Sequence, residues 1–176
     1  MTAQPPHAAA PREPQRQPAR SSARLTVVIM GSGRTGAALA TRLAADGHRV
    51  TLIDVNPDAF ERYLEASFPG RTVLGNGIDE DVLREAGIDH ADGFVACAGS
   101  DNENLMAAQT AKVAFGVKRV VCRCNDAVRA EIFGQLGLVI ASPSQLVAHA
   151  LRDAMLSDKE HERDVAASID RLLVRP

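Results

Sequence analysis

The 176-residue chain is 45% hydrophobic and 24% charged, and its 20 Lys and Arg residues almost balance its 22 Asp and Glu residues. This composition is typical of one globular domain, and it argues against nucleic acid as a ligand because no excess of positive charge is available for a phosphate backbone. Aromatic residues make up only 3% of the chain, so stacking platforms for single strands or sugars are not expected.

Residues 1–24 differ from the rest of the chain. They hold five of the nine prolines and four arginines, but no Val, Ile, Leu or Phe. We expect this leader to be disordered and to lie outside the fold, either solvated or in weak contact with an acidic membrane surface. It has no hydrophobic signal region, and no run of about 18 apolar residues follows it, so secretion and membrane insertion are not expected.

Three cysteines without C-x-x-C spacing favour a reduced, cytoplasmic protein.

From residue 25 onward, short apolar runs predict six strands buried on both faces. The runs are 25–30, 49–54, 72–74, 93–98, 119–123 and 138–141. Stretches of about 10 to 14 residues with helical periodicity separate them, and two of these begin with a cap followed by proline, at Asn56-Pro57 and Ser142-Pro143. The alternation predicts an α/β fold: a Rossmann-like, doubly wound parallel sheet of about six strands with helices on both faces.

The predicted nucleotide-binding domain covers residues 25–142, and a helical segment for subunit contacts covers 143–176. The first part of that segment carries an apolar stripe that fits either packing on the sheet or a dimer seam. Its members are Leu146, Val147, Ala150, Leu151, Ala154 and Met155. A second helical stripe has no evident partner within the domain and consists of Val165, Ile169, Leu172 and Leu173.

A glycine motif, G-x-G-x-x-G, lies between the first strand and the first helix at residues 31–36. Gly31 permits a tight turn, Gly33 lets the backbone approach a phosphate, and Gly36 allows close packing of helix on strand. The helix N-terminus then presents free N–H groups to an anion.

Asp54 lies 18 residues beyond Gly36, at the end of the second strand. A carboxylate there accepts hydrogen bonds from the hydroxyls of an adenosine ribose and disfavours the 2′-phosphate of NADP. The alternative role for Asp54 is a helix cap, but Asn56 is better placed for that.

Arginines mark two further candidate positions. Arg34 lies in the first helical turn, where its positive charge is repelled by the positive end of the helix dipole, so a contact with a phosphate would explain it. Arg123, ending the fifth strand, is either a second phosphate ligand or an ion-pair partner of Asp126. Glu103 either completes a capping box with Ser100 or lies on the ligand side.

No catalytic set accompanies these binding residues. The only tyrosine, Tyr63, lacks the Tyr-x-x-x-Lys spacing of short-chain dehydrogenases, and no lysine precedes Lys112, so a P-loop is absent. We therefore expect a binding protein rather than an enzyme. The alternatives are the cofactor domain of an NAD-dependent oxidoreductase without its catalytic part, and a structural adaptor with a vestigial site.

Five segments in order along the chain support a family comparison. They are Gly31–Gly36, Asp54–Asn56, Gly75–Asp79, Ser100–Leu105 and the stretch from Cys124 to Gly137. With these segments the chain resembles the N-terminal nucleotide-binding lobe of the RCK/KTN proteins, regulatory subunits of Trk- and Ktr-type potassium uptake systems, over about residues 26–156. It departs from the family in having Gly75-Asn-Gly-Ile where Gly-Asp-Ala-Thr is more frequent. The 20 residues after Leu156 are too few for the family's C-terminal lobe, so we expect a one-lobe protein, a half that pairs with another subunit, or a truncated chain.

The resemblance implies a cytoplasmic domain at the inner face of the membrane that binds NAD(H), ATP or ADP. It also implies dimers that assemble into a ring, with the helix after Pro143 crossing to the neighbour, and ligand exchange that gates a membrane potassium-translocating subunit. By position, phosphates would be held by Gly31, Ser32, Gly33, Arg34, Thr35 and Gly36, and the ribose by Asp54 and Asn56. The adenine side would be held by Asn76 and Gly77, and the distal phosphate or nicotinamide by Ala98, Gly99, Ser100 and Arg123. Because Asp54 contacts only the ribose that NAD and ATP share, the sequence leaves the choice between them open.

Overall fold

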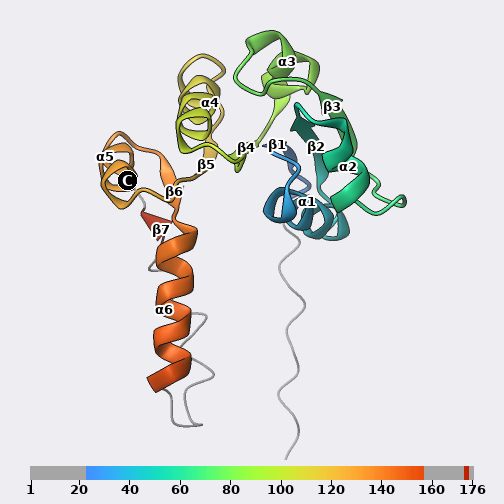
Figure 1. The fold of residues 1–176 in the computed structure, drawn as a ribbon. Coiled ribbons are helices and arrows are strands. Elements are labelled where there is room, and N and C mark those ends of the chain that lie inside the picture. The colour runs from blue at the N-terminus through green and yellow to red at the C-terminus, as the bar shows by residue number, and fades with distance from the viewer. Residues whose placement is uncertain (1–22, 157–172, 175–176) are drawn as a thin grey trace, which may run out of the picture.

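The computed structural model describes residues 23–156 and 173–174. They form one seven-stranded sheet in the order β3-β2-β1-β4-β5-β6-β7, and the first six strands are parallel (Figure 1). The strands are β1 (Thr26–Met30), β2 (Arg49–Asp54), β3 (Arg71–Leu74), β4 (Gly93–Ala96), β5 (Arg119–Arg123), β6 (Val139–Ala141) and β7 (Leu173–Val174). The predicted doubly wound parallel sheet is confirmed, with strand ends within two residues of those expected. The leader, residues 1–24, was predicted to be disordered. Its residues 1–22 lie outside the described residues.

Helices connect the strands and cover both faces of the sheet. They are α1 (Arg34–Ala45), α2 (Pro57–Tyr63), α3 (Glu80–Glu85), the short 3₁₀ helix η1 (Ile88–His90), α4 (Asp101–Val113), α5 (Ala127–Gln135) and α6 (Pro143–Leu156). None of the helices in the described parts of the chain is both long enough and apolar enough to cross a bilayer.

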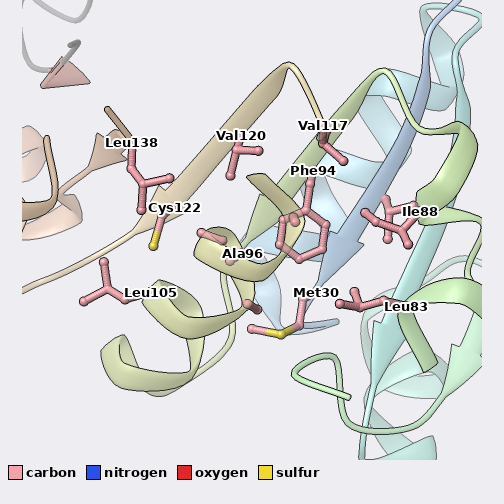
Figure 2. Close-up of a cluster of buried hydrophobic side chains, with 14 of the residues drawn as sticks. Met30, Leu83, Ile88, Phe94, Ala96, Leu105, Val117, Val120, Cys122 and Leu138 are labelled. Carbon is pink, nitrogen blue, oxygen red and sulfur yellow. The ribbon is translucent and has the colours of Figure 1, made fainter. Parts of the chain in front are cut away.

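One hydrophobic cluster lies on each face of the sheet, because successive residues of a strand point to opposite faces. In β1, Val27 and Ile29 pack with α1 and α2, whereas Val28 and Met30 pack with α3 and α4. The second, larger cluster surrounds Phe94 at the middle of the sheet, as Figure 2 shows. The sheet is therefore rigid at its centre, which fixes the loops that follow its strands.

Strand β7 departs from the sequence prediction. Leu173 was expected in a second helical stripe, but Leu173 and Val174 pair antiparallel with Ala141 and Ile140 of β6. Strand β6 would otherwise form an open edge, and pairing satisfies its backbone groups. The other members of that stripe, Val165, Ile169 and Leu172, lie outside the described residues.

Helix α6 extends away from the sheet (Figure 1) and buries none of its residues. Its large apolar side chains are exposed, Val147 to 56%, Leu151 to 66% and Met155 to 86%. The alternative in which this stripe packs on the sheet is therefore wrong for the described chain. Strand β6 ends at Ala141, and the helix that follows leaves the sheet instead of folding back over a face.

Candidate functional site

The predicted site residues gather at the carboxyl edge of the parallel strands. They come from the loops after β1, β2, β3, β4 and β5, around the point where the chain switches from β1 to β4 as neighbours in the sheet. In open α/β sheets this switch point forms the crevice in which ligands bind. The structure thus brings the five loops to one edge.

The glycine loop after β1 is tightly constrained at two of its three glycines. Gly31 has φ +101°, and a Cβ there would lie 2.6 Å from the backbone nitrogen of Ala98. A Cβ on Gly36 would lie 1.8 Å from the carbonyl oxygen of Gly31. By contrast, a Cβ on Gly33 would meet nothing within 4 Å. Gly31 and Gly36 are therefore required by the fold, whereas Gly33 faces open space.

Helix α1 starts at this loop, and neither a side-chain cap nor an acidic residue balances the free N–H groups at its N-terminus. Gly33 is its N-cap, no side chain caps it, and its first turn contains no acidic residue. The N–H groups of a first helical turn have no partner within the helix, and they carry partial positive charge. Arg34 and Thr35 are exposed there, and no hydrogen bond or ion pair to the Arg34 side chain is found among the described residues. The arrangement suits an anion.

Asp54 joins the second strand to the glycine loop. Its Oδ2 accepts the N–H of Ser32 at 2.6 Å, and its Oδ1 accepts the N–H of Asn56 at 2.9 Å. A carboxylate offers about four acceptor positions, so two remain for ribose hydroxyls. Asp54 therefore also fixes the shape of the glycine loop, a structural role that the sequence analysis did not assign to it.

The side chains of the next two candidates are already used in local turns. Asn56 caps α2 by accepting the N–H of Asp58 at 3.0 Å, as the Asn56-Pro57 pair predicted. Asn76 accepts the N–H of Ile78 at 3.2 Å. Gly77 is buried, and a Cβ there would lie 2.4 Å from Cγ of Met30. These residues line the β2 and β3 end of the site chiefly through their backbone.

The loop after β4 passes directly beside the glycine loop. Ala98 contacts it, Gly99 is exposed with open space around it, and Ser100 caps α4 by accepting the N–H of Glu103 at 3.4 Å. The Glu103 carboxylate is exposed, and the described hydrogen bonds do not include the return bond to Ser100 that a full capping box requires.

Buried polar atoms without partners test whether these residues suit a polar ligand. Among the described residues, three side-chain atoms are buried without a hydrogen bond: Ser32 Oγ, Arg123 Nε and Ser142 Oγ. Ser32 and Arg123 both belong to the predicted site, and such atoms are costly unless a ligand or water satisfies them. The ion pair considered between Arg123 and Asp126 is not formed, because Asp126 caps α5 and pairs with Arg129 at 3.6 Å.

Three further residues support the site and were not singled out from the sequence. Cys97 lies beneath the glycine loop, where burial raises the pKa of its thiol to about 11, an effect that Arg123 opposes and Asp54 reinforces. Asn104 and Asp101, on α4, hold the backbone of neighbouring loops. Each looks in sequence like an ordinary core or helix residue, and only the long-range contacts distinguish it.

A cavity of about 620 Å³ lies at the opposite edge of the sheet. Its lining includes Arg24, His48, Arg49 and Arg71 at the amino ends of β1, β2 and β3. None of the predicted site residues contributes to it. Helices α1 and α3 end at this edge, where exposed carbonyl groups disfavour anions, and Arg71 donates to the Glu85 carbonyl oxygen at 2.8 Å.

Comparison with known proteins places this geometry in context. Residues 27–143 match the family model of the TrkA-N domain. The Trk system potassium uptake protein TrkA of Streptomyces coelicolor is 49% identical over 112 residues, which are 64% of this chain and 50% of that protein. The chain thus spans about half the length of this relative.

Solved structures share the fold. The AMP-bound Kef CTD of Shewanella denitrificans has a TM-score of 0.65 at 19% identity, covering 83% of this chain and 91% of that one. GsuK bound to ADP has a TM-score of 0.64 at 23% identity, covering 75% of this chain and 34% of that one.

Proposed function

The chain belongs to the TrkA-N domain family, and from this premise we propose that it binds an adenine nucleotide and thereby regulates a membrane potassium transporter. The observation that carries the proposal is the loop at residues 31–36. It ends on a helix N-terminus without a side-chain cap, and it is bonded to Asp54, which lies at the end of β2 on the same edge of the sheet. This combination holds a phosphate and a ribose at once.

Each part of the site has a separate task in this proposal. The backbone of residues 31–36, with Ser32, Arg34 and Thr35, binds the phosphates. Asp54 and Asn56 contact the ribose, and Asn76 and Gly77 border the adenine. Ala98, Gly99, Ser100, Glu103 and Arg123 surround the distal phosphate or the nicotinamide. The buried, unpartnered atoms of Ser32 and Arg123 support the assignment at the two ends of the phosphate chain.

We propose NAD(H), ATP or ADP as the ligand and no chemical reaction on it. The AMP-bound and ADP-bound proteins of similar fold support a ligand with an adenosine phosphate. The site presents an arginine at either side but no residue arranged to abstract or deliver a proton to a substrate. A nucleotide then acts by binding one arrangement of the subunits more tightly than another, and it shifts the equilibrium only by that difference.

The partner in this proposal is the potassium-translocating membrane subunit, which the protein contacts from the cytoplasmic side. The relatives named Trk system potassium uptake protein support this assignment. Helix α6, which exposes its apolar stripe, is the element through which we propose that the chain forms dimers and larger rings.

Two measurements test the proposal. Native mass spectrometry of the purified protein should detect a copurified adenine nucleotide and report the subunit number. Titration calorimetry should then give micromolar or tighter dissociation constants for ATP, ADP or NAD(H). A protein that binds none of them would overturn the proposed function.

A pair of arginine variants sharpens this test. Arg34→Ala should weaken ATP by about tenfold while changing adenosine little, because only ATP carries the charge that Arg34 would contact. The matched control is Arg42→Ala in the last turn of the same helix, which should change neither ligand. Equal losses for ATP and adenosine would refute the assignment of Arg34 to phosphate.

A further inference from the structure

Asn104 is a polar side chain fully buried in an apolar part of the molecule. It lies in the first turns of α4, next to Leu105, Ala107 and Ala108, which belong to the larger hydrophobic cluster. Asparagine is a weak helix former, and burial of an amide is costly unless its groups are bonded. A buried asparagine at this position therefore requires strong compensation.

The compensation comes from the backbone of two different loops. Oδ1 of Asn104 accepts the N–H of Ala98 at 2.7 Å, and Nδ2 donates to the carbonyl oxygens of Ala98 at 3.0 Å and Arg123 at 3.1 Å. Both amide hydrogens and one acceptor position are thus used, and all the partners are main-chain atoms at the carboxyl edge of the sheet.

These bonds are formed just past the end of the ladder between β4 and β5, although Arg123 still pairs with Ala141 of β6 on its other side. The last paired residues of β4 and β5 are Ala96 and Cys122, so Ala98 and Arg123 lie beyond the end of the ladder between the two strands. The Asn104 side chain bridges the two strand ends in place of the missing ladder bonds. The Asn104 side chain thereby holds the loop after β4 at a fixed spacing from the end of β5.

Ala98 contacts the glycine loop directly, whereas Arg123 lies near Cys97. The backbone of Ala98 lies so close to Gly31 that a Cβ on Gly31 would be 2.6 Å from its nitrogen. The side chain of Arg123 carries the buried, unpartnered Nε, and its charge acts on Cys97, which lies beneath the loop. A displacement of either backbone would therefore move a wall of the site.

A second contact from the same helix supports this role. One turn before Asn104, the Asp101 carboxylate accepts the N–H of Asn125 at 2.9 Å and that of Asp126 at 3.1 Å. Asp126 in turn caps α5. The first turn of α4 consequently fixes the loops after both β4 and β5.

We infer that Asn104 is the positioning residue of the nucleotide site: it sets the distance between the loop after β4 and Arg123, and so the affinity for the phosphates beyond the adenosine. The inference rests on the proposed function. Asn104 is too deeply buried to contact the nucleotide, and it acts through Ala98 and Arg123. Asp54, on the ribose side, is bonded to Ser32 and Asn56 and not to Asn104, Ala98 or Arg123.

Calorimetry with ADP and adenosine on three proteins tests the inference. Asn104→Leu keeps the branched shape and the number of heavy atoms but removes all three bonds, and it should raise the dissociation constant for ADP by about tenfold or more while changing that for adenosine much less. Ile88→Ala, which opens a cavity in the same cluster near the opposite edge of the sheet, should lower the unfolding temperature but leave both dissociation constants within about twofold. If Asn104→Leu does not fold, Asn104→Ser takes its place, since a water can fill the smaller side chain's space.

Hydrogen exchange on the ligand-free proteins provides a readout that does not depend on nucleotide binding. The amide hydrogen of Ala98 should exchange faster in the Asn104 variants than in wild type. In Ile88→Ala its exchange rate should be the same as in wild type. A folded Asn104 variant that binds ADP like wild type, or loses ADP and adenosine equally, would overturn the inference and leave the proposed function intact. Wild-type protein that protects Ala98 yet binds neither ligand would instead overturn the proposed function, and with it the role of Asn104 in affinity.

Discussion

The three glycines of the loop after β1 are required for different reasons. A side chain on Gly36 would overlap the carbonyl oxygen of Gly31, whereas one on Gly33 would enter open space. The protein itself therefore gives no steric reason for a glycine at position 33. A ligand phosphate resting on that backbone would supply one.

Alanine substitutions at these two positions separate folding from binding. Gly36→Ala should lower the free energy of unfolding by about 3 kcal/mol or more, because helix and strand must move apart. Gly33→Ala should cost at most about 1 kcal/mol, yet weaken ADP binding by about tenfold or more. Chemical denaturation and calorimetry measure both quantities. ADP binding by Gly33→Ala that equals wild type would contradict the placement of a phosphate at the loop.

Asp54 combines a structural and a binding role, because its two oxygens already accept the N–H groups of Ser32 and Asn56. Asp54→Asn turns one acceptor into a donor that faces an N–H group, so it should weaken AMP, ADP and ATP alike, by about ten- to a hundredfold. Calorimetry with the three nucleotides checks the equality, since they share the ribose. Asp58→Asn, an exposed carboxylate on α2, is the control and should change none of them. A loss of affinity that grows with the number of phosphates would show that Asp54 acts on the phosphates, and it would contradict the placement of Asp54 at the ribose.

At the scale of elements, Asp101 in the first turn of α4 binds the loop after β5, which leads into α5. Burial raises the pKa of the Asp101 carboxyl, but hydrogen bonds from the N–H groups of Asp126 and Asn125 and from Cys124 more than offset this, and the pKa is lowered from its ordinary value of 3.8. A lowered pKa in the folded state means that the ionised group stabilises the fold above the ordinary value. That stabilisation is lost as the pH falls through the folded-state pKa.

The Asp101→Asn variant tests this link. It should be less stable than wild type by about 1 kcal/mol at pH 7, because neutral acceptors form weaker bonds to N–H groups. The difference should shrink below about pH 4, where wild type also loses its charge. Denaturation curves at several pH values measure it, with Asp89→Asn at the opposite edge as the control. A difference that is constant with pH would show that the charge of Asp101 contributes nothing.

The elements differ in how far the sequence predicts them. The six parallel strands and the glycine loop are local patterns of apolar runs and spacing, so they could be predicted, and the resemblance to the RCK/KTN proteins is confirmed by the family match. Asn104 lies in one of the segments that carry the resemblance, but its bonding role could not be predicted, because its partners lie outside α4 and Arg123 is 19 residues away. Strand β7 has only two residues and no periodicity, so its pairing with β6 depends on an edge that only the folded sheet creates.

At the scale of the whole molecule, the described chain brings the five candidate site loops to one edge of the sheet but leaves α6 without a partner in that part of the chain. The 14 residues of α6 extend about 20 Å and bury nothing in the described chain. An apolar helix of this kind is stabilised by packing rather than by propensity alone. Self-association through α6 would supply that packing and would join the sites of two subunits.

Charge placed in the apolar stripe of α6 tests this arrangement. Leu151 is 66% exposed in the described chain, so Leu151→Lys should leave the unfolding temperature of the monomer and its affinity for ADP unchanged. In a dimer the ammonium group would be buried in an apolar seam, and the dissociation constant of the dimer should rise by about tenfold or more. Sedimentation over a range of concentrations measures it, with Val113→Lys on α4 as the control, since Val113 is 83% exposed. Identical association of wild type and Leu151→Lys would mean that α6 is not the contact. The exposed stripe would then need a different partner, because an isolated helix of this length is only marginally stable in water.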